Sequence, residues 1–316
     1  MWHGVVGVVP AAVGRELEAL GAAVAAVVPA KADDNLLIGT WNVRAFGGLS
    51  ATWAVSASQS PRRDWRAVAC VARIVEHFDV LALQEVRRNT TALRYLLATL
   101  GPDWKVLASD VTEGSGGNGE RLAFVYDRTR VEPSGLVGEI VLPPAAGDPS
   151  AQFARTPYAV GFERAGVEFV LTTVHVLWGT GAARLPEVVA FAQWMRAWAD
   201  RRDDWNTNLL VLGDFNLDRV GNPLFEAFVS TGLWPPAELN AVPRTIFDDA
   251  EGKHFYDQIA WFSQSDGRSM LRSLRYAGRA GGFDFIPHVF PGLSRTEVSW
   301  RISDHYPLWA EFTVGA

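Results

Sequence analysis

Short apolar runs that predict β-strands recur along the 316-residue chain, and several follow one another with no helical segment between them. Each run is rich in Val, Ile, Leu and aromatic residues and is bounded by Gly, Pro or Asp, as strands are. The runs are residues 36–43, 80–84, 122–126, 158–162, 167–176, 209–212, 255–262 and 308–314. Because a doubly wound parallel sheet needs a helix after each strand, the pattern favours packed mixed sheets.

Helical spacing of apolar residues occurs in fewer segments, which we expect to cover the outer faces of the sheets. These segments are residues 62–78, 90–100, 185–201 and 223–231. Stretches with neither pattern predict loops that could build a site. They are residues 47–60, 112–119, 143–154 and 263–300. The predicted fold class is therefore α+β, with central sheets between outer helices.

An additional helix is predicted before the first strand. Its apolar residues recur at helical spacing between Pro10 and Pro29, and they are Val13, Leu17, Leu20, Val24 and Val27. We interpret residues 1–34 as an N-terminal helical extension and linker, and residues 35–316 as the main domain. The extension could dock either on this domain or on a partner.

The composition indicates a folded globular protein with no general attraction for polyanions. Hydrophobic residues make up 48% and charged residues 20%, and 35 acidic against 29 basic residues give a net charge of −6, so phosphate binding must be local. No apolar run approaches a membrane span, and the first ten residues lack the Lys or Arg of a secretory signal. The single cysteine, Cys70, is expected to be buried, and we expect a cytoplasmic protein with secretion left open.

Polar residues stand at the ends of the apolar runs. They include Asn42, Glu85, His175, Asp214, Asn216, Asp257, Asp304 and His305. A carboxylate at the end of an apolar strand is partly desolvated, so a cation, a proton or a donor usually accompanies it. A turn explains one such residue, but six strand ends of this kind indicate a shared pocket at one edge of two sheets.

Phosphoester hydrolysis requires these residue types. A hard divalent ion prefers oxygen ligands, which Glu85 supplies together with Asp304 or Asn42. Water activation requires a histidine that a carboxylate holds in one tautomer, as His305 and Asp257 could provide. His175 needs a second carboxylate, and Glu120 is the available one.

Six motifs in order carry a resemblance to a known family. They are Trp41-Asn42-Val43-Arg44, Gln84-Glu85-Val86-Arg87, Thr173-Val174-His175, Gly213-Asp214-Phe215-Asn216, Tyr256-Asp257-Gln258 and Ser303-Asp304-His305-Tyr306-Pro307. Over residues 36–313 the chain resembles the endonuclease/exonuclease/phosphatase superfamily, and within it the deoxyribonuclease I branch. The resemblance implies a four-layer αββα sandwich, in which two central mixed β-sheets are flanked by helices.

The resemblance also implies a role for each motif residue. Glu85 matches the principal Mg²⁺ ligand, which Mn²⁺ could replace, with Asn42 and Asp304 beside the metal. Asp214 and Asn216 match the pair that orients the attacking water and stabilises charge on the phosphorus centre.

Two histidines and three arginines complete the implied site. His305, held by Asp257, resembles the general base, and His175, held by Glu120, resembles the histidine that serves the leaving group or a phosphate oxygen. The arginines matched to phosphate contacts are Arg155, Arg44 and Arg87.

The leading hypothesis is a Mg²⁺-dependent nuclease that cleaves DNA by in-line attack of an activated water. The alternative is a phosphatase or a phospholipase-C-like hydrolase of a phosphorylated small molecule or lipid headgroup. Asn118 stands where nucleases of this branch carry an aromatic residue for the minor groove, which weakens the expected grip on a duplex. A non-catalytic binding module is disfavoured because the set of carboxylates and histidines is intact.

Residues near the motifs also have a structural interpretation. Trp41, Trp178 and Trp300 flank motif residues, and we expect core packing for them before substrate stacking. Arg62 and Arg63 are expected to form the solvated first turn of a helix.

Overall fold

Two six-stranded sheets form the centre of the computed structural model, which describes residues 8–56, 58–113, 116, 118–143, 152–249, 252–264 and 268–315. The first sheet has the order β11 (Arg275–Gly282), β12 (Leu308–Thr313), β1 (Asn35–Phe46), β2 (Val80–Arg87), β4 (Glu120–Asp127) and β3 (Trp104–Ala108). The second has the order β5 (Glu132–Glu139), β6 (Tyr158–Arg164), β7 (Val167–His175), β8 (Leu209–Asp214), β10 (Asp257–Phe262) and β9 (Leu233–Trp234).

Both sheets are mixed, as the sequence predicts. β1 pairs with β2 in parallel and β7 pairs with β8 in parallel, whereas the remaining neighbours pair antiparallel. Parallel pairs require helical crossovers, and helices follow β1 and β7 in the chain. The parallel pairs lie at the middle of each sheet, where both faces are covered.

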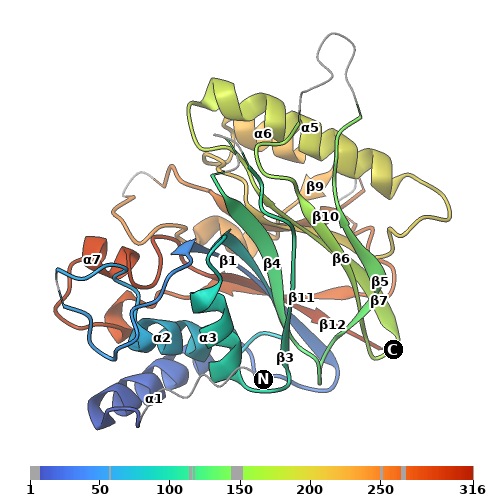
Figure 1. Cartoon of the computed structure of the whole chain (residues 1–316). Coiled ribbons are helices and arrows are strands. Elements are labelled where there is room, and N and C mark those ends of the chain that lie inside the picture. Colours follow the sequence, from blue (N-terminus) through green and yellow to red (C-terminus); the bar gives the residue numbers. More distant parts are fainter. Residues whose placement is uncertain are drawn as a thin grey trace.

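Helices cover the outer faces of the two sheets, so that four layers result (Figure 1). On the first sheet lie α2 (Trp65–Val75) and α3 (Thr91–Leu100), with α1 (Ala11–Ala25) packed against α2, and on the second sheet lie α5 (Gly181–Ala199) and α6 (Pro223–Val229). Short elements complete the loops: η1 (Ala237–Ala241), η2 (Ile286–His288) and α7 (Arg295–Ser299). The αββα sandwich is confirmed.

The alternation of side chains along a strand explains how one strand serves two cores. Leu37 of β1 packs toward the helices of the first sheet, whereas Leu36 and Ile38 face the second sheet. The layer between the sheets also contains aromatic residues such as Phe124 and Phe162, whose rings meet edge to face at 5.8 Å between centroids. Both faces of the central strands are therefore buried, which is why they appear in the sequence as continuous apolar runs.

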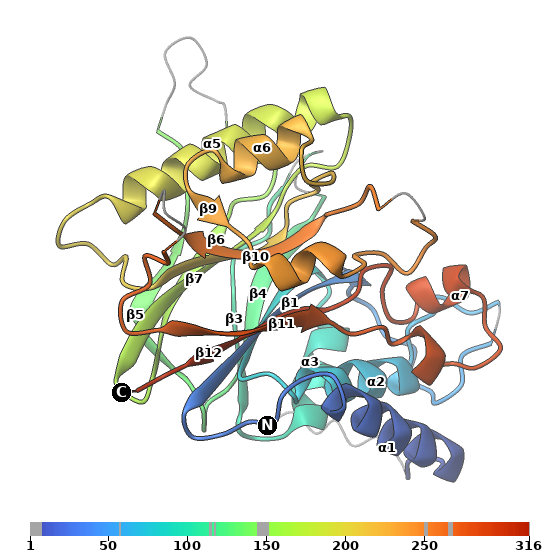
Figure 2. The same ribbon diagram turned by 180° about the vertical axis from the view of Figure 1, so that it is seen from behind.

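The N-terminal helix docks on the body of the protein, next to α2 (Figure 2). Leu20 and Val24 of α1 are completely buried in the apolar cluster that includes α2. At the same contact the guanidinium of Arg66 forms an ion pair with Glu16 at 2.6 Å. The domain boundary after residue 34 stays a prediction.

The eight strands predicted from the sequence are the eight interior strands, and the four that were missed, β3, β5, β9 and β11, are the sheet edges. An edge strand is covered less completely and tolerates the Gly and Pro residues that interrupt β5 and β11. The prediction of a loop over 263–300 was wrong. This range contains the edge strand β11, which was missed for the reason just given, and the short helix α7. Most of the predicted loop 143–154, and residues 114, 115 and 117 of the Gly-rich loop, lie outside the described residues.

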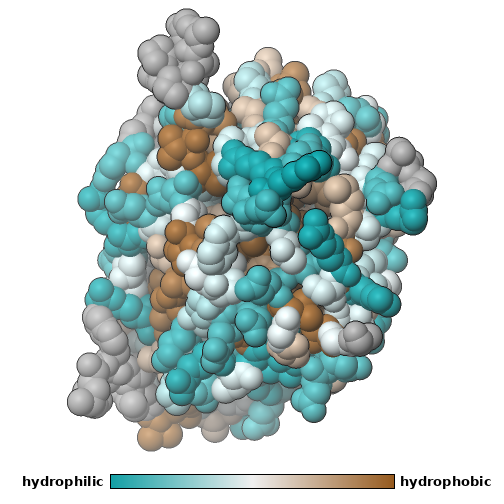
Figure 3. Space-filling model, turned by 90° about the vertical axis from the view of Figure 1, so that its right-hand side faces the viewer, coloured by the Kyte–Doolittle hydropathy of each residue, from teal (hydrophilic) through white to brown (hydrophobic). Residues whose placement is uncertain are grey.

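Two further expectations can be compared with the structure. Cys70 is buried, as predicted. Within the described ranges no helix is long and apolar enough to cross a membrane. The face in Figure 3 shows apolar areas interspersed among polar side chains.

We predict that Val24→Ala lowers the free energy of unfolding by about 2 to 3 kcal/mol, because it removes two buried methyl groups and leaves a cavity between α1 and α2. The matched control is Val27→Ala, because Val27 lies just beyond α1 and is 46% exposed. Urea denaturation measures both variants. Equal small effects would show that α1 does not contribute to the cooperative fold.

Candidate active site

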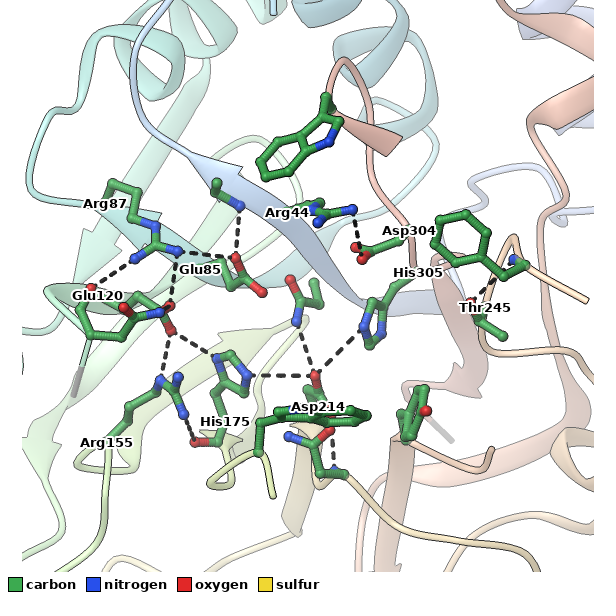
Figure 4. Close-up of a pocket in the computed structure, with 18 residues that line it drawn as sticks. Arg44, Glu85, Arg87, Glu120, Arg155, His175, Asp214, Thr245, Asp304 and His305 are labelled. Atoms are coloured by element: carbon green, nitrogen blue, oxygen red, sulfur yellow. Dashed lines mark hydrogen bonds and ion pairs between the residues drawn. The ribbon is translucent and has the colours of Figure 1, made fainter. Parts of the chain in front are cut away.

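Eleven of the twelve residues singled out from the sequence line one cavity of about 440 Å³ at the ends of the central strands (Figure 4). They are Asn42, Arg44, Glu85, Arg87, Glu120, Arg155, His175, Asp214, Asn216, Asp304 and His305. The twelfth, Asp257, is completely buried and lies behind His305. The expected shared pocket at one edge of the two sheets is therefore present.

Irregular backbone at the strand ends aims several of these side chains. Glu85 lies in a stretch where the pairing of β2 with β4 shifts register, and it has a φ of +60°. A bulge of this kind redirects a side chain that a regular strand would send to one face. At the end of β8, Gly213 has a φ of +141°, and a Cβ there would lie 2.3 Å from the carbonyl oxygen of Val174. Only glycine lets the backbone of β8 approach β7 this closely. The next residue, Asp214, is thereby placed beside His175 at the end of β7.

The first histidine pair consists of His305 and Asp257, whose Nδ1 and Oδ2 atoms are 2.7 Å apart. Burial raises the pKa of Asp257 to about 6, although the charge of His305 opposes the shift. Burial alone would lower the pKa of His305, but the charges of Asp257 and Asp214 raise it to about 10. The contact at Nδ1 leaves Nε2 of His305 directed toward the cavity and toward Asp214, 3.9 Å away.

The second pair consists of His175 and Glu120, with 3.0 Å between Nδ1 and Oε2. Arg155 contacts the same carboxylate oxygen through Nε at 2.6 Å. Burial alone would raise the pKa of Glu120, but His175, Arg155 and Arg87 together hold it at about 2. Glu120 is thus an anion on which a histidine and two arginines converge.

Asp214 connects the two pairs, as the dashed lines in Figure 4 show. Its Oδ2 lies 3.6 Å from Nε2 of His175 and accepts a hydrogen bond of 2.9 Å from Nδ2 of Asn42. Its Oδ1 accepts the backbone N–H of Asn216 at 2.9 Å. Burial would raise the pKa of Asp214, but the two histidines hold it below its ordinary value. Both imidazole Nε2 atoms therefore approach one buried carboxylate oxygen.

The residues matched to a metal fit a hard cation. Oδ1 of Asn42 is buried and has no hydrogen-bond partner among the described residues, a state that costs about 1 to 3 kcal/mol unless a ligand relieves it. Glu85 is fixed by the backbone N–H of Ala45, which donates to Oε2 at 2.7 Å. Asp304 contacts Arg44 at 3.2 Å through Oδ2. The donor set is all oxygen, as Mg²⁺ or Mn²⁺ prefers.

A second group of possible metal ligands is formed by Asp214, Asp257 and His305, whose ligand atoms all lie within 4.8 Å of one another. The hydrogen bond between His305 and Asp257 already accounts for most of this proximity. Oδ1 of Asn42 and Oδ1 of Asp257 are both buried without a hydrogen-bond partner among the described residues. Asn42 and Glu85 therefore stay the predicted metal ligands.

The three arginines line the cavity, and each has an anionic partner in its wall. Arg155 is buried against Glu120, and Arg87 lies between Glu120 at 3.3 Å and Glu85 at 3.5 Å. Arg44 pairs with Asp304, and its guanidinium carbon lies 3.8 Å from the ring centroid of Trp300. Their expected contacts with a phosphate stay predictions.

Two expectations about neighbouring residues were wrong. Trp41 is buried, but Trp178 and Trp300 are 64% and 47% exposed at the mouth of the cavity. Arg63 is not solvated: helix α2 begins at Trp65 with Asp64 as its cap, and Arg63 is buried. Burial lowers the pKa of Arg63 to about 10, and its guanidinium donates only to backbone carbonyls.

Sequence reasoning also missed four participants. Arg244 is buried and donates to the backbone carbonyl of Asp257 at 2.8 Å, whereas Thr245, Phe247 and Tyr256 line the cavity. Tyr256 stands beside Asp257 in a motif, which is a signal that could have placed it there. The buried arginines give no such signal because their partners are backbone atoms.

We predict that Glu120→Gln lowers the free energy of unfolding by about 3 kcal/mol, because it leaves the buried guanidinium of Arg155 without its counter-charge. The control is Glu113→Gln. Glu113 also pairs with an arginine, Arg88, but both side chains are about two-thirds exposed, so we expect no measurable change. Similar losses in urea denaturation of the two variants would contradict the assignment.

Known proteins similar to this chain include two deoxyribonucleases and a phosphatase. The chain is 30% identical over 301 residues to a deoxyribonuclease of Thioalkalivibrio sp. (strain K90mix), covering 90% of this chain and 73% of that protein. It is 26% identical to deoxyribonuclease-1 of Bos taurus, covering 88% and 93%. Among solved structures, a mannosyl-6-phosphatase of Bacteroides thetaiotaomicron superposes with a TM-score of 0.60 at 19% identity, covering 88% and 99%.

The family model described as "Endonuclease/Exonuclease/phosphatase family" matches residues 39–305, a range that contains every residue of the site. This match agrees with the αββα sandwich, with the motif order and with the deoxyribonuclease relatives. The chain therefore belongs to the endonuclease/exonuclease/phosphatase family, a family of metal-dependent hydrolases, and has the deoxyribonuclease I-like fold.

Proposed function

We propose that this protein is a Mg²⁺-dependent phosphodiesterase that cleaves DNA. The observation that carries the proposal is the pair of buried histidine–carboxylate contacts whose Nε2 atoms both approach Asp214 Oδ2, at 3.6 and 3.9 Å. Two imidazoles on opposite sides of one small cavity suit a reaction that removes one proton and delivers another. The deoxyribonuclease relatives support DNA as the substrate.

His305 is proposed as the base that takes a proton from the attacking water. Without a cation its pKa of about 10 would keep the imidazole protonated at neutral pH, so this role requires a cation held next to Asp304 to lower that pKa. Asp257 holds its Nδ1, so that in the neutral imidazole Nε2 is the free acceptor and faces the cavity. Asp257 also stabilises the imidazolium that results. The water oxygen then bonds to phosphorus as the bond from phosphorus to the leaving oxygen breaks, and His175 supplies the proton to that oxygen.

Asp214 and Asn216 are proposed to orient the water. Asp214 is held by Asn42 and by the backbone of Asn216, so its position does not depend on the substrate. Because these groups are already in position, the protein spends little free energy on rearranging them when the transition state forms. The cation held by Glu85, Asn42 and Asp304 would neutralise charge on the phosphoryl oxygens.

Arg155, Arg87 and Arg44 are proposed to add fixed positive charge around the same phosphate. Their carboxylate partners, Glu120 and Asp304, hold them in place and partly offset their charge. The chain as a whole carries a net charge of −6, so these local cations, with the metal, supply the attraction for an anionic substrate.

The direct test measures two reactions of the purified protein in one buffer with fixed Mg²⁺. Nicking of supercoiled plasmid reports phosphodiester cleavage, and free phosphate reports hydrolysis of inositol phosphates, sugar phosphates and nucleotides. The proposal expects plasmid nicking that EDTA abolishes. Phosphate release from a monoester with no nicking would contradict it and favour a phosphatase.

We predict that Glu85→Gln lowers kcat for plasmid nicking by two or more orders of magnitude with the fold retained, because a neutral amide replaces an anionic ligand of a hard cation. The matched control is Glu168→Gln, an exposed position on β7, which should leave the rate unchanged. Circular dichroism and urea denaturation check the fold. Undiminished nicking by Glu85→Gln would move the metal elsewhere.

A further inference from the structure

A second cavity of about 420 Å³ adjoins the active site and shares Arg44, Ala45 and Trp300 with it. We call it the Trp300 subsite, and its lining residues are Arg44, Ala45, Gly48, Ser60, Pro61, Arg62, Arg63 and Trp300. No acidic residue is among them, in contrast to the active cavity, which contains four carboxylates. The subsite therefore extends the reaction centre into a region of positive charge.

An aromatic platform separates the two cavities. The indole of Trp300 is 47% exposed, and the guanidinium of Arg44 lies over it at 3.8 Å from the ring centroid. Nη1 of Arg44 also donates to Oγ of Ser299 at 2.9 Å and contacts Asp304 at 3.2 Å. Figure 4 shows Arg44 directed to Asp304 from the end of β1. The platform thus has a defined position relative to the catalytic residues.

Buried Arg63 fixes both parts of this platform. Its guanidinium donates to the carbonyl oxygens of Arg44 and Ala45 on β1, at 2.7 and 2.9 Å. It also donates to those of Arg301 and Ile302, at 2.9 and 3.0 Å, in the segment that follows Trp300. One side chain therefore ties the backbone that carries Arg44 to the backbone that carries Trp300. A preorganised surface of this kind loses little entropy when a ligand binds.

We propose that the Trp300 subsite binds an unpaired nucleobase next to the scissile phosphate, with Arg62 near the following phosphate. This inference rests on the proposed function and specifies its substrate as single-stranded DNA. Arg62 lines the subsite and is half-buried, and its Nη1 donates a hydrogen bond of 3.1 Å to the carbonyl oxygen of Ser56. Arg44 covers one face of the Trp300 indole, so the base would stack on the other face of this partly exposed ring, as it can because every base has a π-face.

Single strands are favoured for a geometric reason. Inside a duplex both faces of each base are covered by neighbouring bases, so Trp300 can stack only on a base that is unpaired or terminal. Asn118 also lines the active cavity and supplies no aromatic ring, and its side chain donates to Glu120 at 2.7 Å. The structure therefore offers a stacking surface for single strands. At the position where an aromatic residue would contact the minor groove of a duplex, it has Asn118, which is polar and already hydrogen-bonded.

The test measures binding without catalysis. The full-length protein is titrated in EDTA against a fluorescein-labelled single-stranded oligothymidylate and against a blunt duplex of the same length, with anisotropy as the readout. We expect Trp300→Ala to raise the Kd of the oligothymidylate about 5- to 150-fold, the range expected for loss of one stacked base, and to change the duplex Kd much less. Trp300→Phe should restore most of the affinity.

The matched control is Trp234→Ala, because Trp234 is 48% exposed and lies on β9, an edge strand outside both cavities. It should leave both Kd values unchanged. Arg62→Ala should reduce the slope of log K against log salt for the oligothymidylate by about 0.7, the value for one lost phosphate contact. Equal losses for the single strand and the duplex at Trp300→Ala would overturn the subsite and leave Trp300 as a support for Arg44.

Nicking assays separate this result from the proposed function. If the wild-type protein cleaves DNA in Mg²⁺ and Trp300→Ala binds the oligothymidylate as the wild type does, the subsite is overturned and the proposed function stands. If the wild type cleaves no DNA, the proposed function is overturned. The EDTA titration then still decides whether Trp300 binds a base.

Discussion

The buried carboxylate of Asp214 is the interaction on which the rest of the site depends. A carboxylate that is 1% exposed is stable only if cations or donors surround it, and this one has Asn42, the backbone of Asn216 and two histidines. Asn42 belongs to the first sheet, whereas Asp214 belongs to the second. The two sheets therefore meet at their ends through polar contacts and along their inner faces through apolar ones.

Glu120 makes a second connection of the same kind. It lies on β4 of the first sheet and contacts His175, at the end of β7 in the second sheet. Both histidine–carboxylate arrangements thus depend on the alignment of the sandwich, and buried Arg63 and Arg244 fix the loops around them through backbone carbonyls. Because loop and sheet share these contacts, the chemistry and the stability of the fold are coupled in this protein.

The sequence predicted the interior of the sandwich and not its margins. Interior strands are buried on both faces over most of their length, so they are largely apolar, whereas β5 and β11 consist mainly of exposed and half-buried residues and carry glycines. Most of the site residues could be grouped because they stand at or near the ends of interior strands. The positions of Trp300 and Arg63 could not be predicted. For Trp300, hydrophobicity alone does not distinguish a buried ring from an exposed one. For Arg63, the hydrogen-bond partners are backbone atoms distant in sequence.

Asp214, Asp257 and His305 are proposed to orient water and move protons, and Glu85 and Asn42 are proposed to hold the metal. The anomalous scattering of Mn²⁺ in crystals of the protein tests this division most directly. We expect a peak within coordination distance of Glu85 and of Oδ1 of Asn42, with the hydrogen bond between His305 and Asp257 preserved. A peak within the group of Asp214, Asp257 and His305 instead would make these residues metal ligands and contradict their proposed roles.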